Sequence, residues 1–182
     1  MNEVEAQDVA IRYLEETDAA PLFENYLGDE QACLYLNRQA HQSSSQTLQA
    51  INRWRTQYEL DVPSILVLAI EESATQVPIG CLVSIPENSH SEIHFGISRN
   101  YQGKGYATQA CKLGIEYLKS VGVKQIHTAP HIDHQASIRV LEKCGFKKQG
   151  VLKEYAVFPA LSPNPQDCLS MYLVMSAASV CN

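Results

Sequence analysis

Hydrophobic and polar positions repeat along the chain with two different periods. Alternating or short continuous apolar runs predict strands at residues 8–14, 64–71, 77–85, 92–98, 125–131, 150–158 and 168–175. Apolar residues spaced three and four apart predict helical stretches at residues 19–27, 30–38, 46–58, 106–120 and 135–144. The prolines between residues 159 and 167 predict a loop between the last two strands.

The order of these elements predicts the fold class. Helices are interspersed among the strands, and a polar turn joins the strands at 64–71 and 77–85 in the manner of an antiparallel pair. This order indicates an α/β layered domain with a mixed sheet. A length of 182 residues suits one ordinary domain, so we expect residues 1–182 to form a single domain.

The predicted strand at residues 92–98 has one apolar and one polar face. Period-two alternation puts Ile93, Phe95 and Ile97 on one face and Glu92, His94 and Ser98 on the other. Glu92 is either a catalytic base or an exposed carboxylate at the end of a strand. His94 is either an alternative base or a packed polar residue.

A glycine-rich turn follows that strand and opens the most regular predicted helix. It comprises Gln102, Gly103, Lys104, Gly105, Tyr106 and Ala107. The first N–H groups of a helix have no internal partner, and glycine lets the backbone approach a phosphate closely, so this turn can bind an anion. It lacks the spacing of a Walker loop and of a dinucleotide fingerprint. A tight turn with no ligand is the alternative interpretation.

Composition and charge exclude several classes of function. The net charge of −6 argues against nucleic-acid binding through a basic patch. The N-terminus has no basic segment followed by an apolar one, which argues against a secretory signal, and no apolar run is long enough to span a bilayer. None of the six cysteines forms a CxxC pair, which favours free thiols in a reducing compartment. The histidines show no metal-binding pattern, and we expect no metal site.

In combination, these motifs resemble the GNAT family of acyl-CoA-dependent N-acetyltransferases. The family pattern Gln/Arg-x-x-Gly-x-Gly/Ala is matched by Gln102, Gly105 and Ala107. The stretch ASIRVLEKCGF, residues 136–146, resembles the helix after the fifth strand of that family. Together with EIHFGISRNYQGKGYATQA, it is most similar to the RimJ/RimL-type branch, the ribosomal-protein N-terminal acetyltransferases.

The resemblance implies a fold and a cosubstrate. It implies a mostly antiparallel sheet of about seven strands, splayed between the fourth and fifth and flanked by about four helices. Acetyl-CoA would place its pyrophosphate on the glycine turn and its pantetheine arm between the splayed strands. The implied cofactor-binding residues are Ile97, Ser98, Arg99, Gln102, Gly103, Lys104, Gly105, Tyr106, Ala107, His134 and Ser137. For Lys104 a solvated surface lysine, and for Arg99 a turn residue, are the alternatives.

The resemblance also implies how the reaction runs. A primary amine would attack the thioester directly, with Glu92 or His94 as general base. Ser137 would protonate the leaving thiolate, or would only satisfy the first turn of its helix. His134 stands where the family usually has an asparagine that contacts pantetheine.

The acceptor and the partners follow from the resemblance only in outline. The acceptor amine is either a protein or peptide N-terminus or a small molecule. Cysteine usage, hydropathy and charge predict a cytoplasmic protein with no membrane or nucleic-acid partner, and a homodimer is left open. A function of another class, a non-catalytic acyl-CoA-binding module, is the alternative, and His134 is the feature that favours it.

Overall fold

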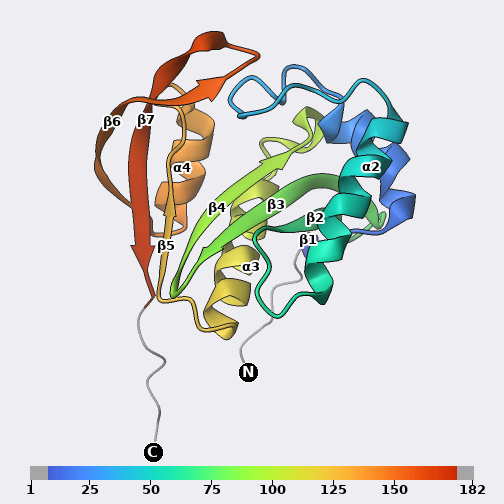
Figure 1. Cartoon of the computed structure of the whole chain (residues 1–182), viewed down its shortest axis with the longest axis horizontal. Coiled ribbons are helices and arrows are strands. Elements are labelled where there is room, and N and C mark those ends of the chain that lie inside the picture. The colour runs from blue at the N-terminus through green and yellow to red at the C-terminus, as the bar shows by residue number, and fades with distance from the viewer. Residues whose placement is uncertain (1–7, 176–182) are drawn as a thin grey trace, which may run out of the picture.

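The structure, a computed structural model, describes residues 8–175 and is built on one seven-stranded sheet (Figure 1). The strands run in the spatial order β1-β2-β3-β4-β5-β7-β6. Every neighbouring pair is antiparallel except β4 and β5, which are parallel. Their bounds are Val9–Tyr13, Leu66–Glu72, Val77–Glu87, His90–Ile97, Gln125–Thr128, Lys147–Phe158 and Ser162–Val174 for β1 to β7.

The sheet is split between β4 and β5. These two strands pair at only three positions, the last of which joins Glu92 to His127. Beyond that position β4 continues to Ile97 while β5 ends at Thr128, and Figure 1 shows the two strands diverging from a common lower end. The predicted splay between the fourth and fifth strands is therefore confirmed, and it leaves one edge of β4 without a partner strand.

Helices cover both faces of the sheet. Helix α1 (Ala19–Leu22), its continuation as a π-helical turn η2 (Phe23–Leu27), and α2 (Ser44–Arg55) lie on one face of β1 to β4. Helices α3 (Tyr106–Ser120) and α4 (Gln135–Lys143) pack on the opposite face. Short 3-10 turns lie at Glu16–Asp18, Thr56–Glu59 and Arg99–Tyr101.

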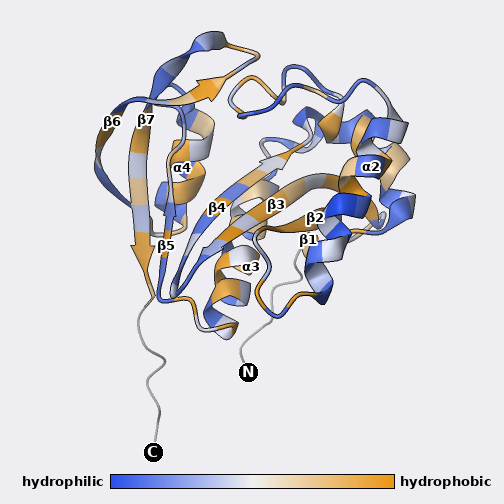
Figure 2. Ribbon diagram, in the orientation of Figure 1, coloured by the Kyte–Doolittle hydropathy of each residue, from blue (hydrophilic) through white to orange (hydrophobic). Residues whose placement is uncertain are grey.

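Burial of the apolar positions explains these layers. Figure 2 shows that hydrophobic residues dominate β2 and β3 in the middle of the sheet, whereas α2 has hydrophilic residues on its outer side. Along β4, Ile93 and Ile97 are buried against the α3 side, as the alternation predicts. Glu92 and His94 therefore lie on the opposite face of the same strand.

The helix predicted at residues 30–38 is wrong. This segment forms a series of turns, with isolated bonds such as Cys33 N–H to Asp29 O. The Asp29 carboxylate accepts hydrogen bonds from the N–H groups of Gln31 and Ala32 and also binds Arg99, which holds the chain in a local turn. We call residues 28–38 the turn segment.

The loop predicted at residues 159–167 is also wrong for most of its length. Strand β7 begins at Ser162, so Pro163 and Pro165 lie within it. There β7 pairs with β6 alone, because β5 reaches only as far as Met171 along β7. A proline that lacks an N–H group is tolerated where one side of the strand has no partner.

The remaining predicted elements are confirmed, with ends that move by a few residues. The predicted strand at 125–131 stops at Thr128, and His131 then forms an isolated bridge with Cys168. No helix within residues 8–175 has the length and apolar character that crossing a membrane requires.

Candidate active site

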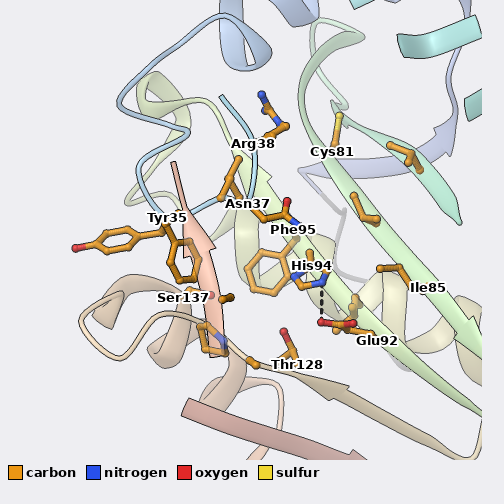
Figure 3. Close-up of a pocket in the computed structure, with 18 of the residues that line it drawn as sticks. Tyr35, Asn37, Arg38, Cys81, Ile85, Glu92, His94, Phe95, Thr128 and Ser137 are labelled. Carbon is orange, nitrogen blue, oxygen red and sulfur yellow. Dashed lines mark ion pairs between the residues drawn. The ribbon is translucent and has the colours of Figure 1, made fainter. Parts of the chain in front are cut away.

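A pocket of about 400 Å³ lies where the sheet divides (Figure 3). Strand β4 contributes Glu92 and His94, and the start of α4 contributes Ser137. The turn segment closes one side with residues that include Tyr35 and Arg38. The volume falls in the range of small-molecule sites.

Glu92 and His94 contact each other inside this pocket. His94 Nε2 lies 3.0 Å from Glu92 Oε1, and the two side chains are 42% and 22% exposed. The hydrogen bond with His94, working against partial burial, lowers the pKa of Glu92. Glu92 is therefore a carboxylate at neutral pH, and it holds the imidazole by one ring nitrogen while Nδ1 is left to contact a ligand.

Further acidic and imidazole groups adjoin this pair. Three side chains come close together here: one polar atom from each of Glu87, Glu92 and His127 lies within 4.8 Å of the other two. His127 Nε2 is 3.9 Å from Glu87 Oε2. The narrow end of the split between β4 and β5 consequently has negative character, which suits a cationic amine.

Ser137 and His134 lie at the start of α4, and their environments differ. The Ser137 hydroxyl lines the pocket and makes no hydrogen bond to another described residue. His134 stacks against Tyr35 at 4.4 Å between ring centroids. Burial, with a smaller effect of His131, lowers the pKa of His134 to about 4, so its imidazole is neutral at pH 7.

The glycine turn after β4 is an open backbone cradle. Gly103 and Gly105 have φ of 80° and 85°, a region that favours glycine, and a Cβ at either would meet no atom within 4 Å. The Gln102 N–H donates to Arg99 O at 3.2 Å. Within residues 8–175, no acceptor binds the N–H groups of residues 103–107, which are therefore available to an anion.

Two cationic side chains flank the turn. Lys104 Nζ lies over the rings of Tyr101 and Tyr106, at 5.0 and 5.6 Å from their centroids. Arg99 Nε donates to Asp29 Oδ2 at 2.7 Å, which ties the glycine turn to the turn segment. Lys104 is thus held by the two tyrosine rings, and Arg99 is paired with the carboxylate of Asp29.

The free edge of β4 offers backbone groups on the side of the split. The Ser98 N–H donates to Ile79 O on β3 at 2.7 Å. Because alternate residues of a strand direct their N–H and C=O groups to opposite sides, those of Phe95 and Ile97 point toward the split. Ser98 itself is buried and faces β3.

The structure brings together most of the predicted site residues, and it adds others. Glu92, His94, His134 and Ser137 line one pocket, while the glycine turn lies beyond the far end of β4. The sequence reasoning missed the pocket residues of the turn segment, namely Tyr35, Leu36, Asn37 and Arg38. The cluster of polar residues after residue 28 could have indicated a turn in place of a helix.

Comparison with known proteins agrees with this architecture. The profile of the acetyltransferase (GNAT) domain matches residues 8–147, which is most of the chain. The chain belongs to the GNAT acetyltransferase family. It is therefore an acyltransferase, and its split sheet is the GNAT fold.

Two sequence relatives of this GNAT protein are named as N-acetyltransferases. The chain is 26% identical over 159 residues to the uncharacterized N-acetyltransferase p20 of Bacillus licheniformis, covering 85% of this chain and 88% of that one. It is 24% identical over 156 residues to the uncharacterized N-acetyltransferase YoaA of Bacillus subtilis, with coverage of 84% and 86%.

Solved structures share the fold. The ribosomal-protein-S5-alanine acetyltransferase of Vibrio fischeri superimposes with a TM-score of 0.80 at 16% identity, covering 93% of this chain and 94% of that one. The spermidine N-acetyltransferase of Vibrio cholerae, solved with CoA and spermine, gives 0.76 at 18% identity and covers 93% and 96%.

Proposed function

We propose that this protein transfers the acetyl group of acetyl-CoA to a primary amine. The observation that carries the proposal is a split sheet with an open backbone cradle beyond one end of β4 and the Glu92–His94 pair near the other. A GNAT enzyme needs an anion site, a channel and a proton acceptor. Along β4 the backbone cradle, the split and the Glu92–His94 pair would supply these three in that order.

Acetyl-CoA would lie along β4. Its pyrophosphate would accept hydrogen bonds from the free N–H groups of residues 103–107 at the positive end of the α3 dipole. Its pantetheine amides would pair with the free backbone groups of Phe95 and Ile97. This course points the thioester toward the pocket that Glu92 and Ser137 line.

His94 would accept the proton of the attacking amine. Glu92 has a lowered pKa and is a weak base, but its carboxylate holds the imidazole and stabilises the imidazolium that forms. The amine nitrogen bonds to the acetyl carbon, the carbon–sulfur bond breaks, and the proton leaves to His94. Glu92 is then a positioning residue for His94.

Ser137 would pass a proton to the departing CoA thiolate and recover one from the imidazolium of His94, so that the proton removed from the amine ends on the CoA thiol. Its hydroxyl lines the pocket and has no described hydrogen-bond partner, which leaves it free to donate. The alternative role is to support the first turn of α4. The Ser137 hydroxyl makes no hydrogen bond to the described backbone that would give such support.

The location and the branch are part of the same proposal. We place the enzyme in the cytoplasm, where its cysteines are kept reduced, and in the RimJ/RimL-type branch that the motifs resemble. The spermidine and ribosomal-protein acetyltransferases that share its fold take two different kinds of amine, so the acceptor requires a separate argument.

Thiol release tests the proposed function. Purified protein is incubated with acetyl-CoA and a panel of amines, free CoA thiol is quantified, and the acetylated amine is identified by mass spectrometry. We expect amine-dependent thiol release with equal amounts of acetylated product. Binding of acetyl-CoA without acetylation of any amine would instead identify a non-catalytic acyl-CoA-binding module.

A further inference from the structure

The acceptor side of the pocket is an apolar chamber. From the Glu92–His94 pair the pocket extends over the face of β2 and β3 that α2 and the turn segment cover. Its walls are mainly aliphatic and aromatic, formed by Leu36, Trp54, Ile65, Val67, Val83 and Ile85. Such walls favour an acceptor whose body is apolar.

One cationic side chain interrupts these walls. Among the described residues that line the pocket, Arg38 is the only lysine or arginine and Glu92 is the only carboxylate. Arg38 belongs to the turn segment, and its guanidinium carbon lies 5.7 Å from the centroid of the Tyr26 ring. Figure 3 shows Arg38 and Glu92 at opposite ends of the pocket.

The hydrogen-bonding capacity of Arg38 is only partly used. Nη1 donates to the carbonyl groups of Leu27 and Gln39 at 3.3 and 3.0 Å. Nη2 is buried and has no hydrogen-bond partner among the described residues. No described carboxylate lies within ion-pair distance of this guanidinium. A buried N–H group without a partner is unfavourable, and an anionic ligand would satisfy it.

The strand register sets the separation between the two ends of the pocket, which are Arg38 and the Glu92–His94 pair. Tyr26 packs against Gly96, since a Cβ at Gly96 would lie 2.1 Å from the Tyr26 hydroxyl, and Arg38 lies over Tyr26. Gly96 is two residues from His94 and four from Glu92 along β4. At about 3.3 Å per residue, the separation along the strand is roughly 7–13 Å, or the length of two to four residues of extended peptide.

We infer that the acceptor is an amine on an apolar body that ends in a carboxylate, which is the chemistry of a short apolar peptide. The amine contacts Glu92 and His94, the apolar body fills the chamber beside Trp54, and the carboxylate binds Arg38. A planar guanidinium matches a carboxylate in shape as well as in charge. A polyamine would instead place a second ammonium group beside Arg38, where like charges repel.

This inference rests on the proposed N-acetyltransferase function, and matched acceptors test it. The wild-type kcat/KM is measured for leucyl-valine, for its C-terminal amide and for spermidine. The acid and the amide differ only in the terminal charge. A charge-assisted hydrogen bond of about 1.5–3 kcal/mol predicts a preference for the acid of roughly 10- to 150-fold. Spermidine is expected to be the poorest of the three.

A variant assigns that preference to Arg38. Arg38→Met keeps an unbranched apolar stem and removes the charge, so the ratio of kcat/KM for acid over amide should fall to about one. The acid should lose far more of its kcat/KM than the amide. Arg53→Met is the matched control, because Arg53 is exposed on α2 and does not line the pocket, and it should keep the wild-type ratio.

The outcomes separate the two proposals. Acetylation of the acid and the amide at equal rates by the wild-type protein, or a preference for spermidine, overturns the inference and leaves the N-acetyltransferase function intact. Binding of acetyl-CoA with no acetylation of any amine overturns both. If Arg38→Met does not fold, the wild-type ratio of acid to amide still decides.

Discussion

Glu92 and His94 lie two residues apart on β4, so their side chains share one face and contact each other. If His94 accepts the proton, His94→Gln should lower kcat/KM by about 10²–10⁴-fold at neutral pH. Glu92→Gln keeps a hydrogen bond to the imidazole but removes the negative charge, so its loss should be smaller. Both losses should shrink as the pH rises, because the amine then loses its proton without help. Steady-state kinetics from pH 6.5 to 9.5 measure this.

The choice of acceptor sharpens that comparison. An α-amine has a pKa near ~8, whereas an alkyl amine has one near ~10.4 and needs more assistance. The variants should therefore lose more activity with an alkyl amine than with a peptide. If Glu92→Gln loses more activity than His94→Gln, Glu92 is the base. Wild-type rates for both variants at pH 7 would exclude the pair altogether.

At this scale the sequence predicted some site residues and missed others for a physical reason. Period-two alternation is local, so it placed Glu92 and His94 on one face without knowledge of the fold. Arg38 and Tyr35 reach the pocket from the turn segment, which the Asp29–Arg99 ion pair ties to the residues before the glycine turn. Asp29 and Arg99 are seventy positions apart in the chain, and no local pattern relates them.

At the scale of elements, the contact between the turn segment and α4 depends on a neutral histidine. His134 stacks on Tyr35, and the pKa of its imidazole is lowered from about 6.5 to about 4 by burial. Between these values the unfolded chain binds a proton that the folded chain does not, so stability falls as the pH decreases through this window. This one group should reduce the unfolding free energy by about 2 kcal/mol between pH 7.5 and pH 5.

Denaturant unfolding at the two pH values measures this loss. His134→Asn introduces a side chain that does not titrate, and the variant should lose about 2 kcal/mol less than the wild type on acidification. His90→Asn is the control, because His90 is exposed at the start of β4 and should leave the wild-type loss unchanged. An identical acid loss in wild type and His134→Asn would contradict the prediction.

Elements with a regular period were predictable, and elements set by distant contacts were not. The 15 residues of α3 have an apolar stripe between a glycine start and a glycine end, and their predicted bounds are correct. The π-helical turn at Phe23–Leu27 and the early start of β7 depend on packing and on which strand edges are free. Neither feature has a local hydrophobic period from which it could be predicted.

At the scale of the whole molecule, the split sheet joins two parts that meet along few backbone contacts. Strands β1 to β4 form one part and β5 to β7 the other, and β4 pairs with β5 at only three positions. No periodicity in the sequence reveals a split, so this feature was predictable only through the family resemblance. A ligand in the split would contact both parts and would stabilise the folded state.

Acetyl-CoA should therefore raise the melting temperature through the glycine turn. At a concentration one hundred times its Kd, a ligand that binds only the folded state adds about 2.7 kcal/mol. For a chain of this size we expect an increase of about 5–10 °C in Tm, measured by thermal unfolding. Pantetheine, which lacks the pyrophosphate, should give a much smaller increase at the same concentration.

Two glycine variants separate the turn from general backbone strain. Gly105 and Gly122 have φ of 85° and 88°, and a Cβ at either position would meet no atom within 4 Å. Valine at either site disfavours that conformation equally, so both variants should melt below the wild type. Gly105 precedes α3 at the turn, whereas Gly122 follows the other end of the helix. Gly105→Val should lose most of the shift caused by acetyl-CoA, and Gly122→Val should keep it. An equal shift in both variants would mean that the phosphates bind elsewhere, because only Gly105→Val disturbs the N–H groups of residues 103–107.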